Sequence, residues 1–266
     1  MLQFETIAGT TTVDMVYART DTELVQDESE YQEGRHQLLL EPTERSGYYV
    51  VEPTDIEATI RFYWKANLKY SEGKTYVRNT YLLHSPFKGR ARRDVEFHGP
   101  AITVKEEHRN WQEDWIYAFQ CPVGSEDIVK WEKRVEYGRW PCKEIQENVM
   151  KSPCFLVPVG HKRSTTPDLE YRMSTSLAER TMVFGMNITQ IRCLIVLKML
   201  TKTRRINEVL KSYFCKTALF YTIDNTSNKG WVEDNLVSCV IKCLQLLVDC
   251  QSYDALFLDR PWYVRG

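Results

Sequence analysis

The sequence predicts an α+β fold in two lobes, a strand-rich half followed by a helical half. In the first 120 residues, short runs of Val, Tyr, Ile, Leu and Trp are separated by Gly, Pro, Asp and Glu, which is typical of strands and turns. After Trp140-Pro141, apolar residues recur at helical spacing instead. Because strands and helices occupy separate stretches, we expect a strand-rich lobe followed by a helical lobe.

The expected elements follow from these two patterns. Strands are predicted over Val13–Ala18, Gln37–Leu40, Tyr48–Val51, Thr59–Trp64, Thr75–Leu83, Trp115–Cys121 and Cys154–Val159. Helices are predicted over Cys142–Met150, Ser174–Met182, Ile188–Leu200, Asn207–Tyr221 and Glu233–Cys250. One broad apolar face is expected on the last helix, formed by Leu236, Val237, Val240, Ile241, Leu244, Leu247 and Val248.

Two charged segments fall outside these elements. Glu23–Glu33 is expected to be an acidic loop or a short exposed helix. Lys88–Arg93 is expected to be a basic loop that is either solvated or in contact with phosphate.

The composition limits the classes of function. Lys and Arg total 35 and Asp and Glu total 36, so nucleic acid would have to bind a local basic patch. The eight cysteines form no CxxC pair, and with five scattered histidines they predict small buried residues rather than a disulfide framework or a zinc site. With neither a signal peptide nor a membrane span predicted, we expect the cytosol or the nucleus.

Two aspartates are candidates for metal binding. Phosphoryl transfer uses divalent cations held by carboxylates on one side of a sheet, commonly an acid-x-acid pair on one strand and a third acid on a neighbouring strand. Asp14 is the second position of such a pair, and Thr12 stands at the first. Asp114 is the candidate third acid, although an aspartate at a strand start is also a common cap or turn residue.

A series of motifs lies in order over residues 95–250. The segments are His98–Ala101 (HGPA), Phe155–His161 (FLVPVGH), Tyr171–Glu179 (YRMSTSLAE), Cys193–Leu200 (CLIVLKML), Lys211–Phe220 (KSYFCKTALF) and Trp231–Leu236 (WVEDNL). Together they resemble the cyclic GMP-AMP synthase and male-abnormal-21 (Mab-21) family of nucleotidyltransferase-fold proteins. The resemblance implies a nucleotidyltransferase core lobe over 1–160 and a Mab-21-like helical lobe of the HhH/H2TH kind over 161–266.

The resemblance also implies site residues. Thr12–Tyr17 lies across the family's catalytic segment and Glu113–Phe119 across its third-acid strand, which makes Asp14 and Asp114 the catalytic and metal-binding residues for Mg²⁺ or Mn²⁺. The implied contacts to the nucleotide substrates, ATP or GTP, are Arg172, Lys198, Ser212 and Tyr213. The chemistry of these residue types fits, since an aromatic face stacks on a base and cationic side chains neutralise phosphate.

Three departures from the family pattern change what we expect of the metal site, the core lobe and zinc binding. Thr12 replaces the first acid, and Ala8–Thr11 is only a remnant of the Gly-Ser loop that cradles phosphates. The long first helix of the family is not found, so we expect the core lobe to be N-terminally incomplete. No His/Cys zinc insertion lies between Arg180 and Cys193, which predicts no zinc and resembles the zinc-free invertebrate-type branch.

Three functions remain open from the sequence. The first is an innate-immune receptor that senses double-stranded RNA and makes a cyclic dinucleotide from ATP and GTP. Its nucleic-acid surface would be drawn from Lys202, Arg204, Arg205 and Lys211. The second is a catalytically inactive Mab-21-like protein that retains a nucleotide- or protein-binding surface in signalling or development. The third is a protein-interaction scaffold without a nucleotide site; the sequence does not indicate an oligomeric state.

Overall fold

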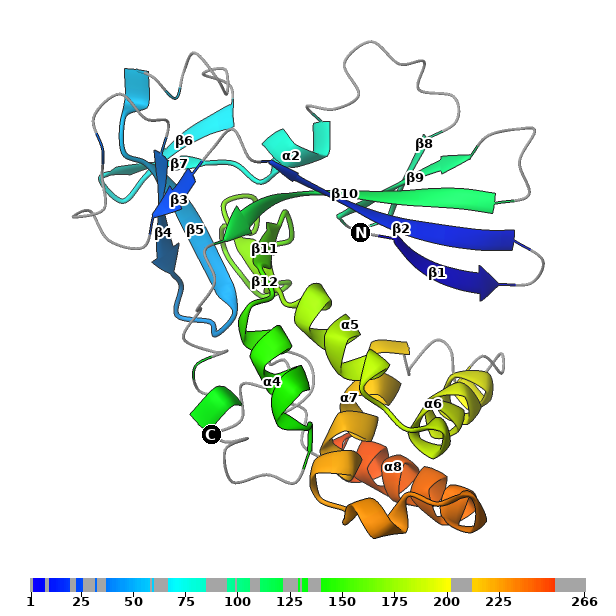
Figure 1. Ribbon diagram of the computed structural model, residues 1–266. Coiled ribbons are helices and arrows are strands. Elements are labelled where there is room, and N and C mark those ends of the chain that lie inside the picture. The colour runs from blue at the N-terminus through cyan, green and yellow to red at the C-terminus, as the bar shows by residue number, and fades with distance from the viewer. Residues whose placement is uncertain are drawn as a thin grey trace. The chain divides into compact units, whose positions relative to one another are not determined.

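The chain forms two compact units in the computed structural model (Figure 1). The structure describes residues 2–7, 10–19, 23–25, 32, 37–57, 59, 67–84, 95–98, 100–105, 111–121, 129, 131–133, 140–201 and 212–251. One unit, the sheet unit, comprises residues 1–122 and 153–175; the other, the helical unit, comprises residues 123–152 and 176–266. The α+β prediction is confirmed, and the chain passes between the units more than once.

The sheet unit is built on a mixed sheet of ten strands among the described residues. The strands are β1 (Leu2–Ile7), β2 (Thr10–Arg19), β3 (Glu23–Val25), β4 (Gln37–Pro42), β5 (Tyr48–Pro53), β8 (Val95–His98), β9 (Ala101–Lys105), β10 (Trp111–Cys121), β11 (Cys154–Val157) and β12 (Tyr171–Ser174). Their order is β1-β2-β10-β11-β12-β5-β4-β3, with the β8–β9 hairpin joined to β10. A separate hairpin of β6 (Leu68–Ser71) and β7 (Lys74–Val77) precedes the short helix α2 (Thr80–His84).

The long strand β10 is the central element of this sheet. It pairs in parallel with β2 along most of its length, antiparallel with β9 over its first half, and antiparallel with β11 at its end. Ala118 and Phe119 are both fully buried although they point to opposite faces, so the end of β10 is covered on both sides. A strand buried on both faces reads as a continuous apolar run, which is why its second half was predictable.

Three predictions in this unit are wrong. The strand expected over Thr75–Leu83 ends at Val77, because buried Asn79 donates its amide to distant carbonyls and turns the chain into α2. Glu23 opens a short strand, β3, rather than a loop or helix, because the two apolar residues that follow it are buried against β4. Thr59 lies in a helical turn, its N–H donating to the Asp55 carbonyl at 3.0 Å, and the other residues of that expected strand, 60–64, are outside the described residues.

The helical unit contains five α-helices of eight or more residues in its described part. They are α4 (Lys143–Met150), α5 (Ser176–Phe184), α6 (Ile188–Thr201), α7 (Ser212–Asp224) and α8 (Leu236–Gln251), with 3-10 turns η5 (Asn228–Gly230) and η6 (Glu233–Asn235) before α8. All five helices were predicted, with small shifts: Ser174 belongs to β12, and residues 207–211 lie outside the described residues. No helix of this described part is long and apolar enough to cross a bilayer.

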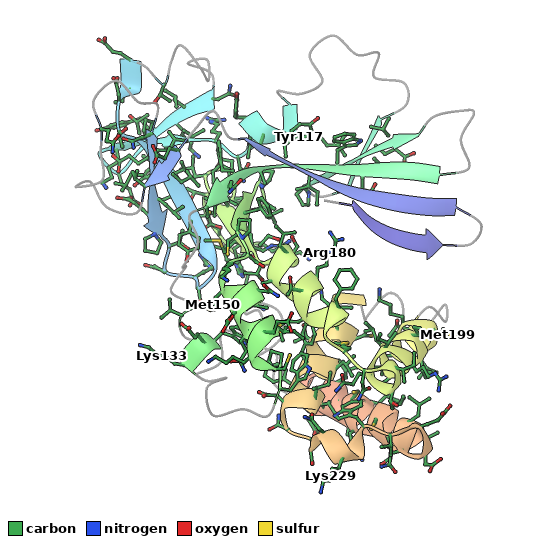
Figure 2. The ribbon with its side chains drawn as sticks, viewed as in Figure 1. Tyr117, Lys133, Met150, Arg180, Met199 and Lys229 are labelled. Carbon is green, nitrogen blue, oxygen red and sulfur yellow. The ribbon has the colours of Figure 1, made fainter. Side chains whose placement is uncertain are left out.

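The core of the helical unit uses residues that the expected apolar face of α8 left out. Cys239 and Cys243 are buried beside Val240 and Leu247, whereas Val237 and Val248 are 71% and 63% exposed. The face prediction is therefore wrong in part, because cysteine packs as a small apolar residue and shifts the buried stripe around the helix. On α6, apolar residues extend to the outward face, where Met199 (Figure 2) is 66% exposed.

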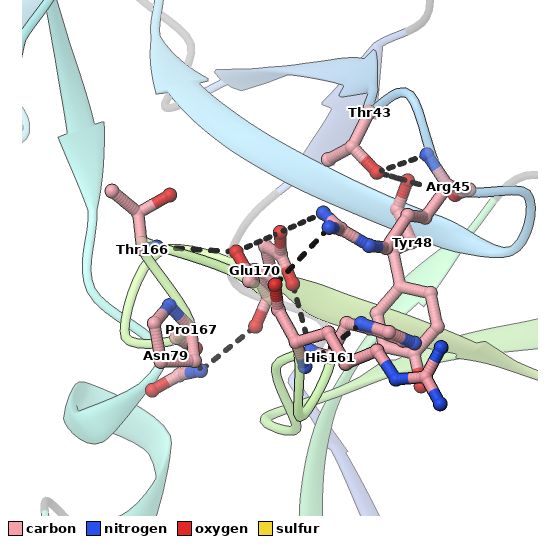
Figure 3. A network of polar contacts seen from close by, with 10 residues as sticks. Thr43, Arg45, Tyr48, Asn79, His161, Thr166, Pro167 and Glu170 are labelled. Carbon is pink, nitrogen blue, oxygen red and sulfur yellow. Dashed lines mark hydrogen bonds and ion pairs between the residues drawn. The ribbon is translucent and has the colours of Figure 1, made fainter.

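A buried carboxylate organises the loop that leads into β12 (Figure 3). Glu170, which is 3% exposed, accepts hydrogen bonds from the backbone N–H of His161 at 2.7 Å and from the Ser164 hydroxyl at 2.6 Å. The Arg45 guanidinium lies 3.9 Å from the same carboxylate. Asn79 adds bonds to the Pro167 and Glu170 carbonyls. Because β12 begins at the next residue, this network fixes where that strand enters the sheet.

We predict that Glu170→Ala destabilises the protein by about 2–4 kcal/mol, because the buried N–H of His161 and the part-buried hydroxyl of Ser164 both lose their acceptor. Urea denaturation followed by circular dichroism measures this loss. Glu44→Ala, at an exposed position of the same unit, is the control and should stay within about 0.5 kcal/mol of the parent. Equal losses for the two variants would contradict the assigned role of Glu170.

Candidate functional site

The two candidate aspartates occupy directly opposite positions in the sheet. In the parallel pairing of β10 with β2, Asp114 is the register partner of Asp14. Neighbouring strands lie about 4.8 Å apart, and paired positions share a face of the sheet. The two residues are separated by a hundred positions in sequence, and the fold brings their backbones together as the acid pattern requires.

Asp114 lies in the interior of its strand. β10 begins at Trp111, before the predicted start at Trp115, so the strand-start interpretation of Asp114 as a cap or turn residue is wrong. Asp114 is half-buried, and the hydroxyl of buried Thr103 on β9 donates to its Oδ1 at 2.5 Å. Thr103 therefore orients the carboxylate. Sequence reasoning missed Thr103 because β9 was not predicted, although Ile102 and Val104 give it the alternating pattern of a strand.

The register of the strands shows which positions of β12 lie on the same face of the sheet as Asp14 and Asp114. Gln120 on β10 pairs with Phe155 on β11, which in turn pairs with Ser174 on β12. Residues an even number of positions apart along a strand share a face, which relates Asp114 to Gln120 and Ser174 to Arg172. Arg172 is exposed, and its position is therefore on the same face as the aspartate pair. Three predicted site residues of the sheet unit thus share one face.

The aspartate pair has a consequence for stability. Like charges at directly opposite positions destabilise a sheet, and a bound cation removes that repulsion. Carboxylate oxygens are the ligands that Mg²⁺ and Mn²⁺ prefer, so the pair fits a divalent cation chemically. Among the side chains that the structure describes, no group of three or more His, Cys, Asp or Glu residues lies together. The structure describes the side chain of Asp114 but only the backbone of Asp14.

The helical unit brings together the other predicted nucleotide contacts. Cys215, in the first turn of α7, lies 4.0 Å from the carbonyl of Leu197 and from the hydroxyl of Thr201, both near the end of α6. Lys198 is next to Leu197, and the expected Ser212-Tyr213 pair opens α7. Lys198 and the Ser212-Tyr213 backbone therefore lie at the same end of the α6–α7 pair.

Electrostatics show that the charge of Lys198 is close to this helix junction. Burial raises the pKa of the Cys215 thiol, and the Thr201 hydroxyl and the Lys198 ammonium both oppose that increase. Lys198 itself is half-buried. Of the side chains of Ser212 and Tyr213 nothing is described, and the four predicted nucleic-acid contacts, Lys202, Arg204, Arg205 and Lys211, lie outside the described residues, as does the basic segment Lys88–Arg93.

An ion pair joins two of the sequence motifs. The Lys216 ammonium of α7 donates to a carboxylate oxygen of Glu179 on α5, and the two side chains are only 24% and 11% exposed. Glu179 closes the YRMSTSLAE segment and Lys216 lies within KSYFCKTALF. Both residues belong to the motifs, but nothing in the linear sequence indicates that they pair. The contact holds the start of α7, which carries Ser212 and Tyr213, against α5.

Comparison with known families bears on the helical unit. Residues 189–258 match the Mab-21 protein HhH/H2TH-like domain. The match begins in α6 and extends beyond α8, and it supports membership of the chain in the Mab-21 family. With the strand-rich unit that precedes it, this Mab-21-like segment is consistent with a two-lobed nucleotidyltransferase-like fold. No curated protein gives a significant match to the chain.

We predict that Asp114→Asn stabilises the metal-free protein by about 0.2–1 kcal/mol, because it removes one of two opposed charges and keeps an oxygen for Thr103. It should also abolish the rise in melting temperature that we expect Mn²⁺ to produce. Differential scanning fluorimetry with and without Mn²⁺ measures both effects. Glu113→Gln, one position away on the other face of β10, is the matched control. A destabilised metal-free Asp114→Asn protein would contradict the repulsion.

We predict that Glu179→Gln lowers the free energy of unfolding by about 1.5–3 kcal/mol, since it removes the carboxylate that pairs with a largely buried ammonium. A double-mutant cycle with Lys216→Met, measured by urea denaturation, isolates the pair. Losses that simply add in the double variant would show that the two side chains are not coupled.

Proposed function

We propose that the chain binds nucleoside triphosphates with Mg²⁺ or Mn²⁺ on the face of the sheet that carries Asp14, Asp114 and Arg172, and transfers a nucleotidyl group. The observation that carries this proposal is the register pairing of Asp14 with Asp114 across β2 and β10. Two acids opposed in this way cost stability unless a cation lies between them. The Mab-21 match over residues 189–258 supports the same class of protein.

Each side chain has a separate task in this proposal. Asp14 and Asp114 would hold the cation, which supplies charge neutralisation at the phosphates. Strand rise and spacing separate the Cα atoms of Arg172 and Asp114 by on the order of 15 Å, so Arg172 would contact a part of the substrate remote from the metal-bound phosphates. On the helical unit, taken by itself, Lys198 would neutralise phosphate and Tyr213 would stack on a base, with Ser212 beside it.

The proposed reaction is phosphoryl transfer to a ribose hydroxyl. The hydroxyl oxygen attacks the α-phosphorus, the bond to the bridging oxygen of the β-phosphate breaks, and pyrophosphate leaves. The hydroxyl proton passes to a carboxylate of the site or to water. With ATP and GTP as substrates, two such steps give a cyclic dinucleotide. In this proposal the chain acts as an innate-immune receptor in the cytosol or nucleus, activated by double-stranded RNA on the Lys202–Lys211 segment.

A second candidate function is a catalytically inactive nucleotide- or protein-binding protein of the Mab-21 family. Thr12 favours it, because threonine stands where the acid-x-acid pattern has its first carboxylate. One charge fewer weakens divalent binding. Nucleotide recognition by Lys198, Ser212 and Tyr213 would survive without the chemistry.

We predict that the purified chain binds ATP or GTP in the presence of Mn²⁺ and that double-stranded RNA stimulates release of pyrophosphate. Isothermal titration calorimetry measures binding, and a pyrophosphatase-coupled phosphate assay with mass spectrometry measures turnover and product. Asp14→Asn and Asp114→Asn should each lower turnover at least a hundredfold by loss of metal, while Glu113→Gln should leave it unchanged.

Other outcomes separate the candidates. Nucleotide binding without pyrophosphate release under any condition, followed by a gain of turnover in Thr12→Asp, would support the inactive protein. A folded chain that binds no nucleotide would contradict both candidates and leave the protein-interaction scaffold.

A further inference from the structure

Two thiols are in contact in the interior of the helical unit, and the proposed function uses neither of them. The Sγ atoms of Cys193 on α6 and Cys243 on α8 are 4.0 Å apart. Both residues are fully buried, and both are free thiols. They are 50 positions apart in sequence, and the packing of α6 against α8 brings them together.

Hydrogen bonds give the two sulfur atoms different environments. The Sγ of Cys243 donates to Oγ1 of Thr222 on α7 at 3.3 Å. The Thr222 hydroxyl in turn donates to the carbonyl of Ala218 at 2.8 Å. Since the proton of Cys243 is directed toward Thr222, the proton between the two sulfur atoms is that of Cys193. Cys193 is therefore the donor of the thiol pair, and Cys243 is the acceptor.

This arrangement favours the thiolate of Cys243 over that of Cys193. The hydrogen bond from Cys193 lowers the pKa of Cys243, burial opposes that decrease, and the Thr222 hydroxyl, once turned toward the sulfur, adds to it. The same bond to Cys243, and then burial, raise the pKa of Cys193. Because the thiolate is the nucleophilic form of cysteine, Cys243 is the first of the two to react.

A second pair of buried cysteines serves as a comparison. Cys121 on β10 and Cys154 on β11 are register partners in the sheet unit, and both are buried. Burial, and then the neighbouring Cys154, raise the pKa of Cys121, and a backbone hydrogen bond from Leu156 opposes the increase without cancelling it. This direction is opposite to that of Cys243, so we expect the pair in the sheet to react more slowly.

We infer that hydrogen peroxide oxidises Cys193 and Cys243 to a disulfide that clamps α6 to α8. The Cys243 thiolate attacks one peroxide oxygen, the O–O bond breaks, and the departing hydroxide takes up the proton that Cys243 released. The sulfur of Cys193 then attacks the resulting sulfenic acid, the S–O bond breaks, and the departing hydroxide and the Cys193 proton form water. In total two thiols lose two electrons, and the peroxide is reduced to two molecules of water.

The inferred clamp goes beyond the proposed nucleotide chemistry and does not depend on it. A disulfide has an S–S distance of about 2.05 Å, so the sulfur atoms must approach by about 2 Å through side-chain rotation and a small helix shift. Because both thiols are buried, the oxidant must be small and must enter during local opening of the helices. The competing explanation is that both cysteines fill the core as small apolar residues.

Peptide mapping of the full chain tests the inference directly. The folded Cys142→Ser chain, which lacks an exposed thiol, is treated with hydrogen peroxide, then unfolded, alkylated and digested with trypsin. We expect the peptide that begins at Cys193 to be joined to the peptide that begins at Cys243, and dithiothreitol to reverse the link. Fragmentation in the mass spectrometer distinguishes Cys243 from Cys250, which lies in the same tryptic peptide.

The melting temperature and sulfenic-acid labelling give further readouts. Because the crosslink restricts the unfolded chain, oxidation should raise the melting temperature by about 3 °C or more. Cys193→Ala and Cys243→Ala should each abolish that rise, whereas Cys239→Ala, a matched change one turn away on α8, should retain it. Dimedone should label Cys243 in the Cys193→Ala protein and leave Cys193 unlabelled in the Cys243→Ala protein.

Several outcomes would overturn the inference. If Cys193 and Cys243 stay reduced in the folded chain, or join only in urea, they are core residues without a redox role. The same follows if the disulfide between Cys121 and Cys154 forms first, since we expect it to form about tenfold more slowly. These measurements use the native residues at both positions, so they stand even if an alanine variant fails to fold. A disulfide that leaves the melting temperature unchanged would contradict the clamp.

Discussion

The parallel pairing of β2 with β10 is the constraint on which the sheet unit depends. It runs through nine register pairs, from Trp111 opposite Thr11 to Phe119 opposite Arg19. A slip of one residue would turn every side chain of a strand to the other face and would separate the two aspartates. The apolar residues near the end of β10 prevent that slip, because Ala118 and Phe119 are buried on opposite faces and cannot exchange places. Packing at one end of the strand thus secures the acid pair at the other.

In the helical unit, packing and one ion pair set the position of the predicted site residues. Helix α7 is its central element, with Leu219 and Phe220 fully buried. Its first turn is held by thiol contacts of Cys215 to α6 and by the Lys216–Glu179 ion pair to α5. The residues expected to contact nucleotide therefore open a helix whose position is set by packing and by one largely buried charge pair. The segment that matches the Mab-21 HhH/H2TH-like domain, residues 189–258, includes this helix.

Much of the fold could be predicted because its signals are local. All five helices show helical spacing over at least two turns, and the second half of β10 is a nearly continuous apolar run. Short elements could not be predicted where contacts between residues distant in sequence determine them. Asn79 ends a strand because its side-chain amide donates to carbonyls some ninety residues away in sequence. The buried stripe of α8 includes cysteines, which a hydrophobicity pattern marks only weakly. Strand β9 was missed as well, and with it the Thr103 hydroxyl that orients Asp114.

The sequence by itself determined the α+β class, the helices and the residue types of a candidate nucleotide-binding site, because propensity, periodicity and motif order can be read along the chain. Only the tertiary structure decided which of those residues meet. That Asp14 is the register partner of Asp114 and that Arg172 lies on their side of the sheet both follow from strand register. Register is a long-range property, because pairing is selected by the burial of distant apolar faces and not by the residues that carry the chemistry.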